Sequence, residues 1–308
     1  MIIIDWISTH NHRNFNRAFF TALENIDSTC IVFSEDLVIP EVKCIFQESS
    51  NSRLGRAIDV FKLILIYRKS RIILLTYDHL WLPFILPFIP NLAAFEHNTT
   101  PEKGLWLKAF WHKYVLKKVT RLAQFPGQYK RLKELSLDAH YIGSPIQIIN
   151  VGKSKRTLAQ GFFTAPTIGA NFNFILSKRH SFLGESIILK KNCSDEQDEF
   201  SLGGVRFKLV ERIDIDSSTL KGIIVTTNSD IRGSGWFNEA IAHNIPIVIL
   251  DHKSELMFNA TFPRYPFYGE GELNLLVEHY LFHDSASNML YCTQNNGKFR
   301  KRFLQAIN

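Results

Sequence analysis

The chain alternates short apolar segments with longer amphipathic ones, a pattern typical of an α/β fold in which helices cover a parallel sheet. In the first half, the apolar segments predict strands at 1–5, 29–34, 43–47, 71–77, 91–96, 120–125 and 139–142. The amphipathic segments between them predict helices at 13–25, 52–70, 79–89 and 103–118.

A second series of the same kind follows a break near 146–155, where Gly143, Pro145, Gly152 and a group of Lys and Arg interrupt the pattern. It begins at 161–170 and continues with predicted strands at 186–191, 205–211, 222–227 and 246–250. Helices are predicted at 236–243, 272–282 and 297–307. Since 308 residues suit two domains of about 150 each, we expect two α/β halves with a cleft between them.

The composition is that of a core-forming protein, with 45% apolar and 21% charged residues. A net charge of +7 favours anionic partners such as nucleotide phosphates, nucleic acid or an acidic membrane surface. The four cysteines are scattered, which fits a reducing cytoplasm. The N-terminus resembles a strand rather than a signal peptide, and the most apolar stretch, 80–90, is too short to span a bilayer. We therefore expect a cytoplasmic protein.

Ionisable and polar residues follow three of the predicted strands in the first half. Because ligands of open parallel sheets bind outside the carboxyl ends of the strands, these positions are the first candidates for chemistry. Asp78, Glu96 and His97 are candidate catalytic residues, since a carboxylate or imidazole there could accept a proton from a hydroxyl. The alternative is that such residues merely cap helices or end strands. On the acceptor side, the candidates after the first strand are His10, Asn11 and His12.

The segment that follows strand 222–227 has the features of an anion site. Gly233, Ser234 and Gly235 directly precede a predicted helix, whose first N–H groups are free to bind a phosphate. Glu239 lies inside that helix, and its two oxygens suit the two hydroxyls of a ribose. Its alternative role is to complement the helix dipole from solvent. Candidate cations for the phosphates are Arg232 and Lys190, with Lys178, Arg179 and Lys191 more typical of surface charge.

Three segments resemble GT-B glycosyltransferases. GSGWFNEAIAHNIPIVIL (233–250) is similar to their donor-site segment, in which Glu239, Ala240, Ala242 and Pro246 match one by one. FPGQYKRLKELSLDAHYIGSPI (125–146) resembles the end of the N-terminal domain in enzymes that act on lipid-linked sugars, and FEHNTTP (95–101) resembles an acceptor-side loop. The resemblance implies two Rossmann-like domains across a cleft, 1–148 on the acceptor side and 149–308 for the nucleotide sugar, with a C-terminal helix free to pack back on the first.

The resemblance also implies a reaction: transfer of a sugar from a nucleotide-sugar donor to a hydroxyl of a glycan or lipid-linked acceptor, in the synthesis of a surface polysaccharide or lipopolysaccharide. Many retaining members carry two glutamates, but Ile231 stands where the first would be, so the stereochemical outcome stays open. We expect no metal and no other cofactor, since helix N–H groups and cations can offset the leaving diphosphate. The sole Asp-x-Asp sequence, 214–216, is expected to cap a helix.

Two other functions compete with this interpretation. A sugar-nucleotide epimerase has a related donor segment, but Gly235-Trp236 and Asn238-Glu239 replace its paired glycines and paired glutamates. A basic nucleic-acid-binding protein would fit the charge, yet no recognised binding motif is present, so we expect no nucleic acid. Segment 103–121 combines lysines with Trp106, Trp111 and Tyr114, which predicts either adsorption to the anionic inner face of the plasma membrane or a helix with an aromatic core face.

Overall fold

The fold is taken from a computed structural model of the chain. The structure describes residues 1–6, 12–40, 42–50, 52–89, 92–97, 99–149, 162–165, 170–190, 199–210, 213, 220–226, 231, 235–279 and 283–308. For residues 12, 170–172 and 277 the description covers the backbone alone.

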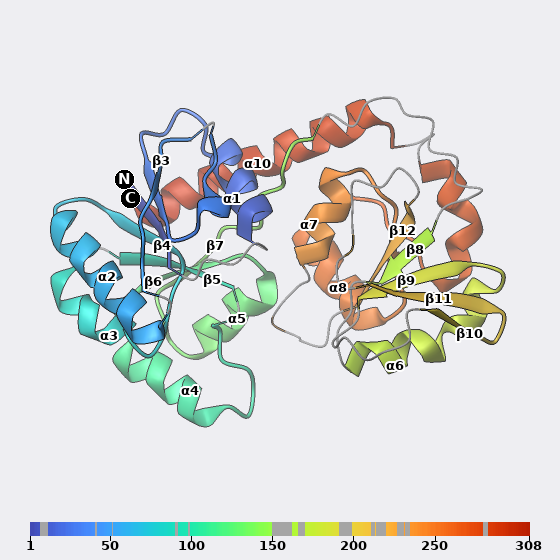
Figure 1. Cartoon of the computed structure of the whole chain (residues 1–308), viewed down its shortest axis with the longest axis horizontal. Helices are drawn as coiled ribbons and strands as arrows, with labels where there is room; N and C mark the ends of the chain where they lie inside the picture. Colours follow the sequence, from blue (N-terminus) through green and yellow to red (C-terminus); the bar gives the residue numbers. More distant parts are fainter. Residues whose placement is uncertain are drawn as a thin grey trace. The chain divides into compact units, whose positions relative to one another are not determined.

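The chain divides into two compact units. Unit 1 comprises Met1–Gln147 together with Asn296–Asn308, and unit 2 comprises Ile148–Asn295. The boundary expected from the sequence, between residues 148 and 149, lies one residue after the boundary between the two units, and the last residues of the chain belong to unit 1. Figure 1 shows each unit as a sheet flanked by helices.

Unit 1 is built on a seven-stranded parallel sheet in the order β3-β2-β1-β4-β5-β6-β7. Its strands are β1 (Ile2–Asp5), β2 (Thr29–Val32), β3 (Cys44–Phe46), β4 (Ile72–Thr76), β5 (Leu92–Glu96), β6 (Thr120–Ala123) and β7 (Ala139–Tyr141). The connecting helices are α1 (His12–Ala22), η1 (Glu35–Leu37), α2 (Arg53–Ile66), α3 (Leu82–Ile85), η2 (Leu86–Phe88), α4 (Trp106–Phe110), η3 (Trp111–Val115) and α5 (Pro126–Glu134).

Both faces of this sheet are buried, which explains why its strands are continuously apolar. Ile72 and Leu74 of β4 pack with α2, α3 and η3 on one face. Ile73 and Leu75 point to the opposite face, where they pack with α1 and with the C-terminal helix α10 (Ser285–Ile307). Phe303 of α10 is fully buried in this second cluster. The second half of α10 therefore completes the core of unit 1.

Unit 2 contains a six-stranded sheet in the order β10-β11-β9-β8-β12-β13. Its strands are β8 (Phe162–Ala165), β9 (Ser186–Lys190), β10 (Glu199–Leu202), β11 (Val205–Val210), β12 (Leu220–Val225) and β13 (Ile247–Ile249). Its helices are α6 (Ala170–Ser177), η5 (Arg179–Phe182), α7 (Gly235–Ala242), α8 (His252–Thr261) and η6 (Glu270–Glu278), followed by α10. All pairs are parallel except β10 with β11.

In both sheets the strand order reverses at one point, as in doubly wound folds. The reversal falls between β1 and β4 in unit 1 and between β8 and β12 in unit 2. Ligands of open α/β sheets bind at this point, outside the carboxyl ends of the strands. The topology therefore directs attention to the residues that follow β4 and β5 in unit 1 and β12 in unit 2.

Some predicted helices differ from those observed. Segment 272–282 was predicted as an α-helix, but η6 is a 3-10 helix over Glu270–Glu278. Segment 103–118 contains a short α4 that continues as the π-helical turn η3, in which His112 is buried. The helix predicted at 297–307 begins at Ser285 instead. Its first half is largely polar, so apolar periodicity did not reveal it.

The helix α8 and the strand β10 were not predicted. Asp251 caps α8, its side chain accepting from Ser254 N at 2.8 Å, in a segment with little apolar periodicity. β10 and β11 form a hairpin whose turn contains Gly203 and Gly204, with φ of 58° and 78°. Two glycines at positive φ are typical of a tight hairpin turn and could have indicated β10.

Among the described helices, none combines the length and the apolar composition needed to cross a bilayer.

Candidate active site

Glu96, the last residue of β5, is fully buried at the carboxyl edge of the unit 1 sheet. Its Oε1 accepts from Tyr77 Oη at 2.8 Å and from Arg121 Nη1 at 3.0 Å. Its Oε2 accepts from the hydroxyls of Thr99 at 2.6 Å and Thr100 at 2.9 Å. Four protein donors thus satisfy this carboxylate, which leaves it poorly placed to take a proton from a substrate.

Arg121 of β6 is the buried counterion of Glu96. Its Nη1 also donates to Tyr77 Oη, and its Nη2 donates to Leu116 O at 3.1 Å, at the end of η3. Burial opposes ionisation of Glu96, but Arg121 and the hydroxyl donors outweigh it and hold the Glu96 pKa below its usual value. The charged pair therefore ties η3, β4 and the loop after β5 together.

His97 follows Glu96 and is only partly buried. Its Nδ1 lies 3.1 Å from Gln124 Nε2, and its ring meets that of Phe15 edge-on with centroids 4.7 Å apart. Gln128 donates from Nε2 to Glu96 O at 2.8 Å and to His97 O at 3.1 Å, which fixes the backbone that carries the imidazole. Of the three predicted catalytic residues, His97 is the least buried as a residue, while its Nε2 atom is itself buried.

Asp78 follows β4 and is engaged with Arg53 at the start of α2. Arg53 donates from Nε and Nη2 to its two carboxylate oxygens, the latter at 2.9 Å, and Leu80 N donates to Oδ1 at 2.9 Å. Burial raises the Asp78 pKa, but the hydrogen bonds from Arg53 and from backbone N–H groups lower it by more, so the net shift is downward. The pair joins the loop after β4 to the start of α2, and Asp78 does not cap α3, whose N-cap is Trp81.

The acceptor-side candidates are described only in part. His10 and Asn11 lie outside the described residues. His12 is the first residue of α1, and its side chain is also outside the description.

In unit 2 the helix α7 begins at the carboxyl edge of the sheet, after β12. Gly235 is its first residue, and a Cβ there would meet no atom of the described residues within 4 Å. Glu239 lies one turn inside α7 and is half-buried. Lys190 is the last residue of β9, at the same edge. Arg232, Gly233 and Ser234 fall outside the described residues.

Sequence reasoning missed four polar residues at these two edges. Arg121, Gln124 and Gln128 of unit 1 lie in or after a predicted strand and hold Glu96 and His97. Thr226 follows β12 in unit 2, and within the described part of the chain its buried hydroxyl has no hydrogen-bond partner. Gln124 and Thr226 directly follow a strand, which was the one available indication, whereas Arg121 lies inside β6 and Gln128 inside α5.

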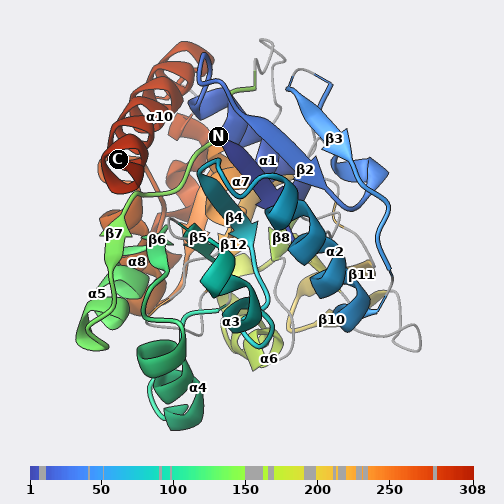
Figure 2. The same ribbon diagram turned by 90° about the vertical axis from the view of Figure 1, so that its left-hand side faces the viewer.

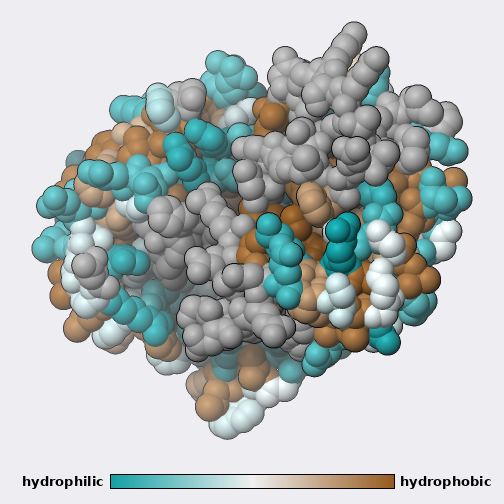
Figure 3. All heavy atoms as spheres, turned by 45° about the vertical axis from the view of Figure 1, so that its right-hand side comes forward, coloured by the Kyte–Doolittle hydropathy of each residue, from teal (hydrophilic) through white to brown (hydrophobic). Residues whose placement is uncertain are grey.

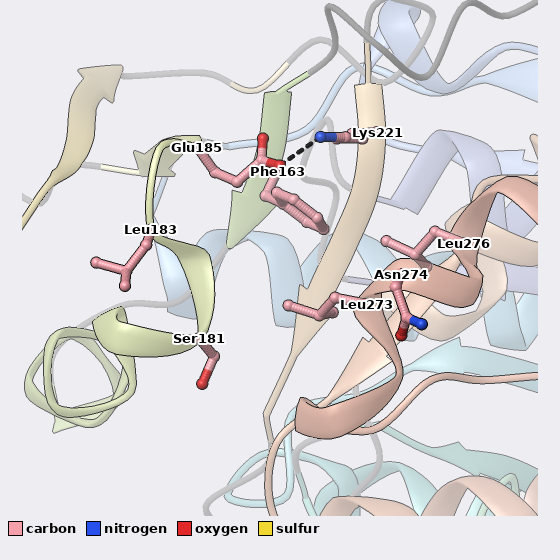
Figure 4. A pocket seen from close by; sticks show the side chains of 8 residues that line it. All are labelled: Phe163, Ser181, Leu183, Glu185, Lys221, Leu273, Asn274 and Leu276. Atoms are coloured by element: carbon pink, nitrogen blue, oxygen red, sulfur yellow. Dashed lines mark hydrogen bonds and ion pairs between the residues drawn. The ribbon is translucent and has the colours of Figure 1, made fainter.

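A hollow of about 300 Å³ lies in unit 2, away from this edge (Figure 4). Phe163, Glu185 and Lys221, which line it, come from the amino-terminal ends of β8, β9 and β12, and Lys221 is paired with Glu185. The other lining residues are Ser181, Leu183, Leu273, Asn274 and Leu276. Since ligands of parallel sheets bind at the carboxyl ends, we do not assign the donor to this hollow.

Two of the weaker cation candidates also lie away from the carboxyl edge. Lys178 and Arg179 follow α6, which carries the chain back toward the start of β9. Lys178 Nζ pairs with Glu270 at 2.7 Å, and Arg179 Nη1 donates to Leu176 O at 3.0 Å. Both cations are therefore held by their own unit.

No family model and no curated protein matches the sequence. Solved structures do match along the whole length. Anabaena HepE in complex with UDP-glucose superposes with a TM-score of 0.59 at 10% identity, over 98% of this chain and 94% of that one. A glycosyltransferase from Rickettsia africae gives a TM-score of 0.57 at 9% identity, over 99% and 95%. A putative UDP-N-acetylglucosamine 2-epimerase from Listeria monocytogenes gives 0.52 at 12% identity, over 99% and 95%.

The chain has the GT-B fold. The fold class expected from the sequence, α/β with two Rossmann-like domains, is confirmed. At these identities the likeness establishes the fold alone, and the placing of the two domains across a cleft stays a prediction.

Within this GT-B chain, the described residues include no group of three or more His, Cys, Asp or Glu that could hold a metal ion. The Asp-x-Asp sequence at 214–216 lies outside the description. Metal independence therefore stays a prediction.

His112 of η3 is a buried histidine beside the Glu96–Arg121 pair. Neither ring nitrogen has a hydrogen-bond partner among the described residues, and its ring centroid lies 6.1 Å from that of His79. Burial, and then the charge of Arg121, lower the His112 pKa from 6.5 to about 3. The imidazole is therefore neutral in the folded protein, whereas the unfolded chain binds a proton below pH 6.5.

Because only the unfolded state takes up this proton, His112 should make the protein less stable as pH falls from 6.5 toward 3. The slope approaches about 1.4 kcal/mol per pH unit for this one group. We predict that His112→Leu leaves stability at pH 7.5 unchanged or higher, since it removes an unsatisfied polar group, and flattens the loss between pH 6.5 and 5. Urea unfolding across this pH range measures both effects.

The surface histidine His140 provides the matched control, because His140→Gln removes an exposed imidazole that pairs with Asp138. An equal loss of stability on acidification in the wild type and in His112→Leu would contradict the assignment.

Proposed function

We propose that this protein is a glycosyltransferase that moves a sugar from a nucleotide diphosphate to a hydroxyl. The start of α7 is the observation that supports this function in a chain with the GT-B fold. This helix begins at Gly235, next to the point where the strand order of unit 2 reverses, and Glu239 lies one turn inside it. Free N–H groups at such a terminus suit a diphosphate, and the carboxylate suits the ribose.

The donor class is supported by the bound ligands of similar structures. HepE was solved with UDP-glucose and with UDP, and the Staphylococcus aureus protein MnaA, which superposes with a TM-score of 0.53 at 11% identity, was solved with UDP. A uridine nucleotide is therefore the first donor base to test for this chain.

In the proposed reaction, the acceptor oxygen bonds to the anomeric carbon of the sugar while the bond from that carbon to the diphosphate oxygen breaks. The nucleoside diphosphate leaves with the bonding electrons, and the hydroxyl proton passes to a base. The N–H groups of α7, with Arg232 and Lys190 as proposed cations, would offset the charge of the leaving group without a metal. We assign proton acceptance to His97, because Glu96 and Asp78 are each paired with an arginine, whereas His97 contacts the neutral side chain of Gln124.

The acceptor is proposed to be a hydroxyl of a glycan or of a lipid-linked sugar, in the assembly of a surface polysaccharide or lipopolysaccharide. Support comes from the resemblance of 125–146 to the end of the N-terminal domain in GT-B enzymes that act on lipid-linked sugars, and of 95–101 to an acceptor-side loop of GT-B enzymes. His10, Asn11 and His12 stay candidates for contacts to this acceptor.

An epimerase is the second candidate, since the Listeria protein and MnaA share the fold and the first is described as a UDP-N-acetylglucosamine 2-epimerase. The two functions differ in one requirement. An epimerase converts the sugar nucleotide by itself, whereas a transferase releases the nucleoside diphosphate and needs an acceptor.

The first prediction of the proposal concerns the donor. Calorimetric titration of the protein with UDP-, GDP-, CMP- and dTDP-sugars should give saturable binding of at least one, and excess EDTA should not weaken it. Proton NMR of the nucleotide sugar after incubation without acceptor, which distinguishes epimers of equal mass, should show the same sugar. Binding of none of the four classes would refute both the transferase and the epimerase, and conversion to a second sugar nucleotide would favour the epimerase.

The second prediction concerns Glu239. Glu239→Ala should weaken binding of the preferred donor about 10- to 100-fold, as expected for the loss of hydrogen bonds to a charged group. Glu278→Ala provides a control, because Glu278 is an exposed glutamate of η6 in the same unit. Equal affinities for the wild type and Glu239→Ala would show that the ribose role is wrong.

His97→Gln separates donor binding from catalysis. It should leave donor affinity within about twofold and lower turnover by about 10²-fold or more, because general-base catalysis contributes on that scale. If His97→Gln lost donor affinity as Glu239→Ala does, the result would indicate misfolding rather than separate roles for the two residues.

A further inference from the structure

Exposed apolar side chains are concentrated in one part of unit 1. Brown apolar spheres lie among teal polar ones on the face drawn in Figure 3, so single exposed apolar residues are not unusual in this protein. Twelve of the 22 exposed large apolar side chains of the described residues, however, fall between Leu54 and Tyr114. They are Leu54, Ile58, Leu65, Ile66, Leu80, Phe84, Phe88, Leu105, Trp106, Leu107, Phe110 and Tyr114.

These side chains come from helices that cover the same face of the sheet. α2, α3 with η2, and η3 pack on the apolar cluster that contains Ile72 and Leu74, and α4 leads directly into η3. Figure 1 and Figure 2 show α2 and α3 beside the unit 1 sheet, with α4 below α3. Phe61 of α2 meets Phe88 of η2 with ring centroids 5.1 Å apart. Trp111 Nε1 donates to His79 O at 2.6 Å, which ties η3 to the loop before α3. We call the outer surface of 52–71, 79–89 and 102–118 the helical face.

The outer side chains of the helical face contribute little to the core. Trp106 is 71% exposed, Leu107 64%, Ile66 71% and Phe84 67%. Trp111, five residues after Trp106, points inward and packs on the core. The aromatic residues of 103–121 are therefore divided between core and surface. Adsorption of the surface residues to a membrane stays a prediction.

The charge of the protein is concentrated on the same surface. Segments 52–71, 79–89 and 102–118 together contain eleven Lys and Arg but two Asp and Glu, while the whole chain has a net charge of +7. The remainder of the chain therefore holds more acidic than basic residues. Lys62, Lys69, Lys103, Lys113 and Lys117 are all exposed.

We propose that the helical face binds the surface of an anionic lipid bilayer. Exposed Trp, Phe and Leu would enter the boundary between head groups and acyl chains, and the lysines around them would meet the lipid phosphates. Tryptophan and tyrosine favour this boundary because one part of each ring system is apolar and another is polar. Each of these helices would lie on the bilayer rather than cross it.

The charge and the apolar side chains together favour this partner over two others. A second copy of the chain would bring two strongly basic faces together, and like charges oppose such an interface. A nucleic acid would meet the lysines, but its phosphates offer nothing to Leu107, Ile66 and Phe84. A bilayer with anionic head groups satisfies both kinds of side chain.

The test uses the full chain and two kinds of vesicle, phosphatidylcholine alone and phosphatidylcholine mixed with phosphatidylglycerol. The protein should sediment with the mixed vesicles and remain free of the neutral ones, and added salt should reduce its binding, since salt screens charge. Trp106→Ser combined with Leu107→Ser should weaken binding at least about tenfold. Lys113→Glu combined with Lys117→Glu should weaken it to a similar degree.

The matched control is Leu256→Ser combined with Leu290→Ser, because these unit 2 residues are 58% and 60% exposed. It should bind like the wild type. Equal binding to both kinds of vesicle, or an equal loss in the control, would overturn the proposal. So would a dimer in sedimentation velocity that Trp106→Ser and Leu107→Ser abolish without affecting vesicle binding. Vesicle binding is measured separately from donor binding, so its result holds whether or not the protein transfers a sugar.

Discussion

Parallel strand pairing is the constraint on which the rest of this structure depends. All seven strands of the first sheet and five of the six strands of the second run in one direction. Parallel neighbours need a crossover connection between them, so helices must cover both faces, and every carboxyl end arrives at the same edge. Chain segments far apart in sequence, such as those after β4 and β5, are thereby brought to one place.

The polar residues at that edge in unit 1 fall into two groups. Glu96, Tyr77 and Arg121 form a buried network that holds η3 and the loop after β5, whereas His97 lies partly exposed on that loop. A buried ion pair gives little net stability, but breaking it leaves an uncompensated charge, so it fixes the arrangement of the elements that it joins. The same network therefore positions the loop that carries His97 and also η3, which is part of the helical face.

The sequence predicted the sheets well, because buried parallel strands are short apolar runs such as IILLT and GIIV. Helices with few apolar positions were missed or shortened, as α8 and the first half of α10 show. Glu96 was identified from its place after a strand, but its role was not, because nothing in TRLA indicates that Arg121 points inward toward it. The direction of Trp106 and Trp111 could not be predicted either, since the π-helical turn changes the spacing of the faces.

The central claim is that the donor binds at the amino end of α7 in unit 2. Amide hydrogen exchange, measured with and without the tightest-binding nucleotide sugar, tests it most directly. The account predicts slower exchange in peptides that cover Gly235–Ala242 and the segment just before it, at the carboxyl edge of the sheet. Protection confined to 181–185 and 273–276, which line the hollow at the opposite end of the strands, would contradict it.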